Sequence, residues 1–421
     1  MVEGIKTDLT LGKVATRRAL NLKYWAQGSG IGPMEGCTVE QSIILGAADS
    51  AIATLSLIGK NLAEVRVWDE TANTLGGTLF KADLLDEGPN ATVYPGLFLD
   101  SSRSLRIVNE QLDEKYYRFD SSTLDVLSVR FPEQIFQDSP AAGKRIEYDP
   151  FTDSLIGPTR FTNDSDKTGI GKLSPQGVFS WLYTGLESYG VTFEIRSFCI
   201  LPNGYVCFGY DGPDLPTTRN VACFDPASGT VLWTRCLSDI NAAYSSEVKS
   251  LRLLPNGTLF VSLCTGTSTL ATFRLNALTG AVIEHAAHAS ISGLGANFSE
   301  QCLVTAAGLI YFTQEANASA VWSFDQDDVT VVEASAALTL AGFEFDYLSL
   351  GLTDNFLYAF ALTSNTNPPA RVRFKHDLSV MEDLSTLIPV SGTLRGWSCN
   401  GDPNGYYLTR VFPLAKAALG L

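Results

Sequence analysis

The chain has 421 residues, of which 45% are apolar and 18% are charged, and its formal net charge is −15 at pH 7. This composition excludes a disordered chain and is typical of a globular protein. The acidic balance argues against general binding to nucleic acid or to an anionic membrane, because both attract basic protein surfaces. No apolar run reaches about 18 residues, so we predict no membrane-spanning helix.

Residues 1–35 precede the regular part of the sequence, and we assign them to an N-terminal arm with closing strands and a linker. The first 25 residues carry five basic and two acidic side chains. They form either a partly ordered terminus or an arm that docks on the acidic body or on a neighbouring subunit. They lack the apolar core of a secretory signal, so we expect a cytoplasmic protein unless a larger particle carries it. Gly28, Gly30 and Gly32 lack the spacing of a phosphate-binding loop and indicate a flexible linker.

From residue 36 to residue 412 the sequence repeats a strand–turn–strand pattern. In its clearest copy, apolar residues flank Pro202, Asn203 and Gly204, which supply the backbone angles of a tight turn. The turn recurs roughly every 50 residues, an interval typical of four-stranded propeller blades. Its eight copies are Asp49-Ser50, Ser101-Ser102, Asp153-Ser154, Asn203-Gly204, Asn256-Gly257, Ala307-Gly308, Asp354-Asn355 and Asn404-Gly405.

A second strand–turn–strand pattern follows each of the first seven copies. Its best example is FDPASGTVLWT (Phe224 to Thr234), and weaker ones are RLNALTGAVIE (Arg274 to Glu284) and RFDSSTLDVLS (Arg118 to Ser128). The pattern resembles the blade signature of quinoprotein-like (PQQ-like) propellers, in which an aromatic residue precedes an Asp or Asn turn, a Gly follows and a Trp ends the next strand. The resemblance implies a β-propeller and no particular activity, because propellers host many unrelated functions.

We therefore predict an all-β fold, a β-propeller over residues 36–412, with eight four-stranded blades favoured over seven. The hairpin predicted over Trp397 to Phe412 has no second hairpin after it, while Ile5 to Ala19 can form strand–turn–strand about Gly12. We expect these terminal strands to share one composite blade and to close the ring, because half a blade would expose a sheet edge. The alternative is a seven-bladed ring with a free arm and an accessory last hairpin. The tail, residues 413–421, forms either a helical turn packed on the propeller or a contact for a partner.

No catalytic, cofactor-binding or metal-binding residues can be assigned from the sequence. Asp164 to Gly169 (DSDKTG) has oxygen ligands at alternate positions, as in a calcium loop, but Pro175 replaces the bidentate carboxylate at the twelfth position. A solvated acidic loop is the favoured interpretation. His285 and His288 are three residues apart in a predicted strand, which favours a surface pair over a ligand pair. The sequence contains no G-x-S-x-G motif, so it offers no elbow-type nucleophilic serine.

Four of the eight cysteines lie in the central repeat: Cys199, Cys207, Cys223 and Cys236. Cys199 and Cys207 are equidistant from Asn203, so a hairpin would place them opposite each other. We predict free, buried thiols that act as small apolar side chains. We expect the tryptophans that recur near strand ends to wedge between blades rather than to line a ligand channel; these are Trp68, Trp181, Trp233, Trp322 and Trp397.

These observations predict a non-enzymatic propeller without a cofactor, which binds protein partners inside a larger assembly. The abundance of small residues and the three histidines suggest, by analogy, a virion protein of a tailed phage, in the tail or the host-attachment apparatus. Two other classes stay open. One is a propeller enzyme, either a quinone-dependent dehydrogenase or a lactonase-like hydrolase, and the other is a carbohydrate-binding propeller.

Overall fold

The structure is a computed structural model whose chain divides into two compact units, and each is described by itself. One unit contains Met1–Glu133 and Leu338–Tyr406, and the other contains Gln134–Ala337 and Tyr407–Leu421. The residues that the structure describes are 9–10, 16–17, 37–45, 51–58, 62–69, 74–83, 95–99, 105–109, 116–119, 126–130, 147–161, 164–174, 178–183, 194–211, 221–244, 248–265, 269–292, 300–314, 320–343, 345–362, 370–386 and 407–421.

The first unit contains a two-stranded sheet and three four-stranded antiparallel sheets. Inner strand β3 lies beside β7 of the next sheet and beside β27 of the last one, so the last sheet in the sequence packs against the first. The strands are β1 (Leu9–Thr10) and β2 (Thr16–Arg17); β3 (Cys37–Leu45), β4 (Ala51–Ile58), β5 (Leu62–Asp69) and β6 (Thr74–Asp83); β7 (Pro95–Leu99), β8 (Leu105–Asn109), β9 (Tyr116–Phe119) and β10 (Val126–Arg130); and β27 (Asp346–Leu352), β28 (Phe356–Leu362), β29 (Arg371–Lys375) and β30 (Met381–Asp383).

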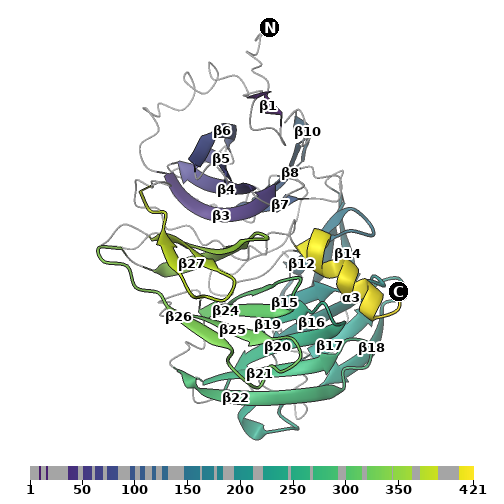
Figure 1. The fold of residues 1–421 in the computed structure, drawn as a ribbon. Coiled ribbons are helices and arrows are strands. Elements are labelled where there is room, and N and C mark those ends of the chain that lie inside the picture. Colours follow the sequence, from purple (N-terminus) through teal and green to yellow (C-terminus); the bar gives the residue numbers. More distant parts are fainter. Residues whose placement is uncertain are drawn as a thin grey trace. The chain divides into compact units, whose positions relative to one another are not determined.

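The second unit contains four sheets in sequence order, with the inner strands β11, β15, β19 and β23 in succession (Figure 1). It also holds a short 3-10 helix and the C-terminal helical segment. The elements are β11 (Glu147–Asp149), β12 (Ser154–Phe161), β13 (Asp164–Leu173) and β14 (Phe179–Tyr183); β15 (Glu194–Ile200), β16 (Val206–Asp211), β17 (Val221–Asp225) and β18 (Thr230–Arg235); β19 (Val248–Leu253), β20 (Thr258–Cys264), β21 (Thr269–Asn276) and β22 (Val282–Ser292); β23 (Glu300–Val304), β24 (Leu309–Gln314), β25 (Ala320–Asp325) and β26 (Ala334–Ala337); and η2 (Ala242–Tyr244), η3 (Tyr407–Val411) and α3 (Phe412–Ala418).

Five of the predicted turns lie where the repeat placed them. The third to the seventh each join the first two strands of a four-stranded sheet, whereas Asp49-Ser50, Ser101-Ser102 and Asn404-Gly405 fall outside the described residues. In the turn between β15 and β16, the Gly204 amide donates to the Leu201 carbonyl over 2.8 Å, and Gly204 has a φ of +84°. Gly257 has a φ of +77° at the equivalent position. Glycine recurs there because residues with a Cβ rarely adopt a positive φ.

The two ends of the chain differ from the predicted composite blade. A hairpin does form near the N-terminus, but β1 and β2 pair with each other and with none of the other described strands. The hairpin predicted over Trp397 to Phe412 is wrong in its second strand. Tyr407–Val411 instead form a π-helical turn that continues into α3. Alanine-rich residues favour the helix, and Pro413 is tolerated in its first turn, where no intrahelical amide bond is lost. The described residues thus contain seven four-stranded sheets, and neither the eighth blade nor its closing strands are confirmed.

Packing between neighbouring sheets provides the core of the second unit. The first three strands of the β15–β18 sheet bury nearly every described side chain, since both faces of the sheet are covered there. One face packs on the β11–β14 sheet through a cluster formed by Ile156, Ile170, Phe198, Ile200, Val206, Phe208, Ala222 and Phe224. The other face approaches β19 so closely that a Cβ on Gly209 would lie 2.5 Å from Val248. A glycine is therefore required at this point by space rather than by backbone conformation.

The C-terminal segment packs on the inner turns of the second unit, as one of the two readings of the tail predicted. The ring of Phe412 lies 6.1 Å from that of Phe151, which belongs to the β11–β12 turn. Leu419 covers Gly257 in the β19–β20 turn, and Val411 and Ala415 are fully buried. Figure 1 shows α3 in yellow, next to the C-terminus of the chain. Since α3 has only seven residues, this packing and not helix propensity stabilises it.

Replacing Ala415 by Asp tests this docking. Ala415 is fully buried, so the carboxylate would either lose its hydration or force α3 off the turns. We expect the melting temperature to fall by several degrees, at roughly 2–4 °C per kcal/mol for a unit of this size. The matched control is Ala417→Asp, which adds the same charge to the exposed side of the same turn and should melt within about 1 °C of the parent. Equal melting of both variants in a circular-dichroism scan would contradict the docking.

Candidate interaction surface of the second unit

Exposed apolar side chains recur at the outer edge of the second unit. Each lies in the connection between the third and fourth strands of a sheet or at the start of the fourth strand. The group on three consecutive sheets, here named the outer apolar band, consists of Val231 (39% exposed), Leu232 (41%), Leu278 (42%), Ile283 (47%) and Val331 (49%). Val178 occupies the equivalent position on the preceding sheet and is 63% exposed. Because the repeat generates this position in each sheet, the band is a property of the architecture rather than a set of scattered surface residues.

Burial changes abruptly between the third and fourth strands. In β17 every apolar side chain is buried, whereas the first three residues of β18 are exposed. The fourth strand lies at the sheet edge, where no further strand covers it. Exposed edges with apolar, β-branched side chains are sites at which another chain can pack or pair.

Two connections hold the parts of the band together. The first joins β18 to the β21–β22 turn of the next sheet. The Trp233 indole Nε1 donates to the Ala277 carbonyl over 3.2 Å, and Arg235 Nε donates to the Gly280 carbonyl over 2.8 Å. The ring of Trp233 occupies the space that a Cβ on Gly280 would need. Leu232 and Leu278 therefore belong to segments that are fixed to each other.

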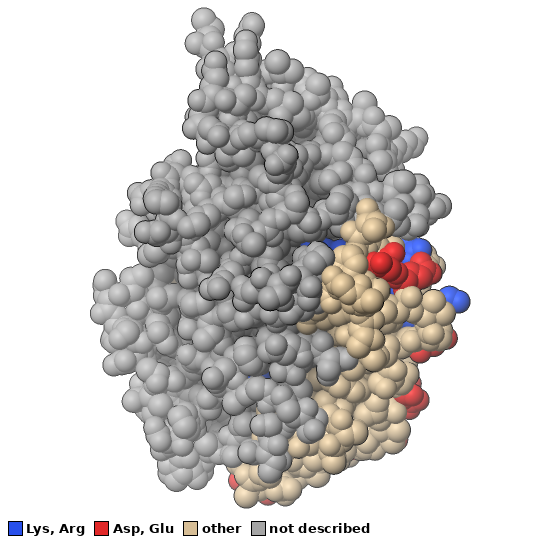
Figure 2. All heavy atoms as spheres, turned by 90° about the vertical axis from the view of Figure 1, so that its left-hand side faces the viewer, with Lys and Arg blue, Asp and Glu red and all other residues tan. Residues whose placement is uncertain are grey.

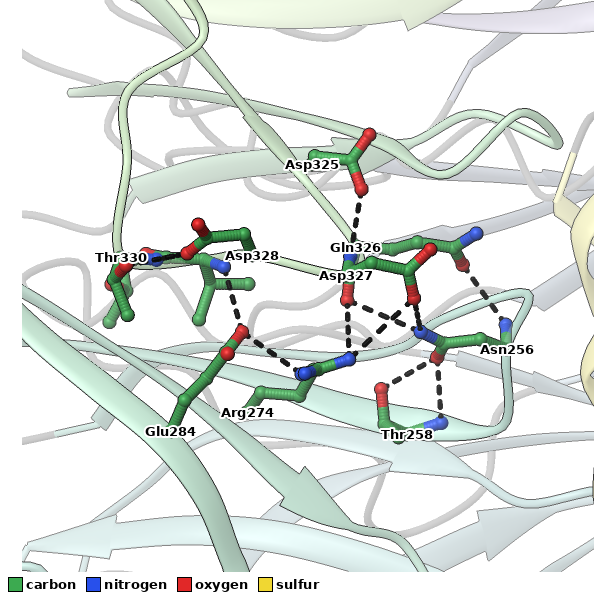
Figure 3. A network of polar contacts seen from close by, with 11 residues as sticks. Asn256, Thr258, Arg274, Glu284, Asp325, Gln326, Asp327, Asp328 and Thr330 are labelled. Atoms are coloured by element: carbon green, nitrogen blue, oxygen red, sulfur yellow. Dashed lines mark hydrogen bonds and ion pairs between the residues drawn. The ribbon is translucent and has the colours of Figure 1, made fainter.

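The second connection is a polar network between the β25–β26 turn and the preceding sheet, drawn in Figure 3. Arg274 Nε lies 3.0 Å from Glu284 Oε1, and the same carboxylate oxygen accepts from the Val329 amide over 2.9 Å. Arg274 Nη1 donates to the Gln326 carbonyl over 3.3 Å. The ion pair is mostly buried, with 15% and 22% of the two side chains exposed. This network fixes the position of Ile283 relative to Val331, because each lies within two residues of a bonded group.

Asn256 completes the network from the inner turn of the β19–β22 sheet. Its amide N–H donates to Gln326 Oε1 over 3.0 Å, and its side-chain Nδ2 donates to Asp327 Oδ1 over 2.9 Å. Its Oδ1 accepts from the Thr258 amide over 3.1 Å. The side chain of Asn256 therefore bonds both within its own turn and to the turn of the next sheet. Its Nδ2 and Oδ1 are both used in this way.

Two carboxylates lie near the band, Asp225 at the end of β17 and Asp328 in the connection between β25 and β26. The Ala227 amide and the Ser228 hydroxyl hold the pKa of Asp225 below its ordinary value. The hydroxyl and amide of Thr330 do the same for the pKa of Asp328, with a smaller contribution from Arg274. Figure 2 shows one side of the molecule on which the described surface is mostly uncharged, with charged side chains at its margins. An apolar surface edged by carboxylates suits a partner with apolar and basic groups.

The residues that the sequence offered for metal chemistry do not assemble. No group of three or more His, Cys, Asp or Glu side chains in the described part of the chain could hold a metal ion. The segment predicted as an acidic loop, Asp164 to Gly169, instead lies in β13, with a register shift against β12. Ladder hydrogen bonds to β12 account for this difference, because the sheet satisfies the backbone of a polar segment as well as that of an apolar one.

The two histidines lie on opposite faces of β22, so the predicted surface pair is only half right. His285 is exposed and stacks on Phe273, with 5.6 Å between ring centroids. His288 is 6% exposed, and its Nε2 lies 2.7 Å from Thr272 Oγ1. The Thr272 hydroxyl donates its proton to the Val329 carbonyl, so His288 Nε2 acts as the donor to Thr272. His288 therefore helps to join two neighbouring sheets.

The tryptophan prediction is confirmed for Trp233, which packs between two sheets. Trp322 instead packs beside Phe312 in its own sheet, with 5.9 Å between ring centroids. The side chains of Trp68, Trp181 and Trp397, and the glycines at 28, 30 and 32, lie outside the described residues.

Among the described helices none is long and apolar enough to cross a membrane.

Sequence reasoning missed the outer apolar band and the Arg274 network. A signal for the band was present, because a β-branched residue follows each second turn of the array in GVF, TVL, AVI, TVV and SVM. The sequence could not show that these residues remain exposed, since a buried strand would have the same pattern. The network had no sequence signal, because its members come from three separate turns and strands.

No protein-family model and no curated protein matches the sequence. Among solved structures, Sqt1 of Saccharomyces cerevisiae is similar with a TM-score of 0.51 and 12% identity, over 83% of this chain and 85% of that chain. The Dos1 propeller gives 0.46 and 12%, over 83% and 90%. BamB of Moraxella catarrhalis gives 0.41 and 14%, over 76% and 93%.

The structures found in this comparison are β-propeller proteins. The likeness to Sqt1, together with successive four-stranded antiparallel sheets, supports a β-propeller fold for this chain. At such low identity the likeness concerns the fold and carries no function. The quinoprotein-like signature and an origin in a phage particle stay predictions.

A glycine pair tests the connection at Trp233. Gly229 and Gly280 occupy equivalent turns with φ values of +70° and +68°, but only Gly280 faces a neighbouring ring. Gly229→Ala should cost about 1 kcal/mol of unfolding free energy through backbone strain alone. Gly280→Ala should cost more, by a further 1 to 3 kcal/mol as an order of magnitude, because Trp233 must also move. Urea unfolding measures the difference, and equal costs would contradict the contact.

His288 should make stability depend on pH. Burial lowers the pKa of His288 from its ordinary value of 6.5, so the folded protein stays neutral at this site where the unfolded chain is protonated. We therefore expect the contribution of His288 to the free energy of unfolding to be greatest above pH 6.5. This contribution should be lost as the pH drops from 6.5 toward the lowered pKa. The carboxylates titrate lower and contribute little in this window.

The variant His288→Gln should flatten the pH dependence over this range, since the titrating group is gone. The matched control, His285→Gln, changes the exposed histidine three residues away and should preserve the contribution of His288. Urea unfolding at pH 7, 6 and 5 gives the comparison. If His288→Gln keeps the parent's slope, the burial does not control the protonation of this group.

Proposed function

We propose that this chain is a non-enzymatic β-propeller that binds protein partners in a multi-subunit assembly. The outer apolar band is the observation that carries the proposal. Its five side chains are 39% to 49% exposed on three consecutive sheets, where water must otherwise solvate them. Recurrent exposure of apolar side chains at one place in an architecture is typical of an interaction surface.

The framework around the band suits binding without a large rearrangement. Trp233 and Arg235 hold one sheet junction, and Arg274 and Glu284 hold the next. Side chains on such fixed segments lose less conformational entropy when a partner binds. The neighbouring carboxylates favour a partner whose contact surface is apolar at its centre and basic at its edge. The net charge of −15 disfavours nucleic acid as that partner.

We further propose that the assembly is a virion, with the chain in the tail or host-attachment apparatus of a tailed phage. The composition supports this finer assignment by analogy: the chain has 36 glycines and only three histidines. If no particle carries the chain, we place it in the cytoplasm. The rival classes, a propeller enzyme or a carbohydrate-binding propeller, have no supporting constellation in the described residues.

A variant of the outer apolar band tests whether this surface binds the partner subunits. Leu232→Glu, Ile283→Glu and Val331→Glu are combined in one chain, because each of these side chains is 41% to 49% exposed. Native mass spectrometry of the source particle, or of complexes purified on a tagged copy, should show the parent chain bound to partner subunits. We expect the band variant to lose at least about tenfold in binding, the cost of roughly 1.4 kcal/mol.

The matched control is Leu414→Glu with Leu421→Glu, which alters two exposed leucines of the C-terminal segment (45% and 48% exposed). This variant should bind like the parent. Partner binding that survives in the band variant would overturn the proposed surface. Reduction of a dye by the purified chain with a quinone cofactor, or turnover of a lactone, would overturn the non-enzymatic assignment.

A further inference from the structure

Three cysteines form a row across the β15–β18 sheet. Cys199 of β15 pairs in register with Cys207 of β16, and Cys207 pairs with Cys223 of β17. Residues directly opposite in antiparallel strands place their side chains on one face, with Cα atoms about 4.5–5.5 Å apart. The three thiols are here named the thiol row. Trp233 of β18 continues the row, since it pairs with Cys223.

The thiol row is buried and its members contact one another. Cys199, Cys207 and Cys223 are 5%, 0% and 1% exposed, and all three thiols are free, as the sequence predicted for the first two. The Cys207 thiol is in hydrogen-bond contact with both of its neighbours. Burial raises the pKa of Cys207 well above its ordinary value, and the contacts with Cys199 and Cys223 raise it further.

We propose that the thiol row is an oxidation site for hydrogen peroxide, in which Cys207 is a partner in every disulfide. Register places Cys207 next to each of the others. Cys199 and Cys223 lie two strands apart, which separates their Cα atoms by about 9.5 Å. A disulfide needs Cα atoms within about 7 Å, so these two cannot bond to each other. This inference is independent of the proposed binding function.

The oxidation balances with one peroxide molecule. The Cys199 thiol, the most exposed of the row, attacks the peroxide bond, becomes a sulfenic acid and releases one water. The Cys207 sulfur then attacks the sulfenic sulfur, the S–O bond breaks, and the thiol proton leaves with the hydroxyl as a second water. Two thiols are oxidised to one disulfide, and the peroxide is reduced to two waters.

The third thiol allows the disulfide to move. Cys223 lies on the side of Cys207 away from Cys199, so its sulfur can attack Cys207 along the axis of the disulfide. Exchange forms Cys207–Cys223 and releases Cys199 as a thiol, without a net change in oxidation state. The disulfide thereby moves from the pair β15 and β16 to the pair β16 and β17, and β17 lies beside Trp233. Because the thiolate is the nucleophile in each step, the raised pKa of Cys207 slows the closing of the disulfide near pH 7, and this step becomes faster at higher pH.

Peptide mapping tests the proposal on the folded full-length chain. The chain is treated with hydrogen peroxide, unfolded, alkylated without reductant and cut with trypsin. Cys199 and Cys207 share the peptide between Arg196 and Arg219, so their disulfide appears as a loss of two hydrogens within one peptide. A Cys207–Cys223 disulfide instead joins this peptide to the next one. We expect one or both products, with a rate that rises between pH 7 and pH 9.

Variants show whether Cys207 is obligatory. Cys207→Ser should form no disulfide at Cys199 or Cys223 after peroxide, while Cys302→Ser, at a buried cysteine of another sheet, should react like the parent. Should Cys207→Ser not fold, two other variants test the same order of steps: Cys223→Ser should form only the Cys199–Cys207 disulfide, and Cys199→Ser, which lacks the attacking thiol, should form no disulfide in the row. A Cys199–Cys223 disulfide, or full alkylation of the parent row after peroxide, would overturn the proposal.

Discussion

Face-to-face contact between neighbouring sheets is the constraint on which this structure depends. A single four-stranded sheet here has two apolar faces, and neither is covered within the sheet. In the β15–β18 sheet one face meets Ile156 and Ile170, and the other meets β19 at Gly209. The sheets must therefore approach closely, which explains why a methyl group at Gly209 would collide with Val248.

The polar contacts have a different role from the apolar ones. Trp233, Arg235 and Arg274 do not provide most of the buried area, but they fix the outer turn of one sheet against the preceding sheet. These contacts are directional, so they set the register of neighbouring sheets where the apolar core alone would allow sliding. The repeated exposure of the outer apolar band follows, because the fourth strand has a fixed place and no further strand beyond it.

The same packing shields two reactive side chains of the second unit from water. Cys207 lies at the centre of a sheet with both neighbours in register, and its thiol is shielded from water. Such a thiol is shielded from large reagents. His288 is likewise a buried titratable group, and it helps to join two sheets. Both side chains are thus placed by the needs of packing.

The sequence alone determined the repeat, and with it the sheets. Turn residues such as Asn203 and Gly204 leave few alternatives for the backbone, so the five inner turns that the structure describes could be placed correctly. The pairing of Cys199 with Cys207 followed from their equal distance to that turn. Tertiary structure decided what local pattern cannot encode. The third member of the row, Cys223, depends on the next turn and its register, and the end of the chain depends on whether Val411 and Ala415 find a buried surface. Tyr407–Val411, predicted as part of a strand, became helical because packing on the inner turns of other sheets outweighs local preference.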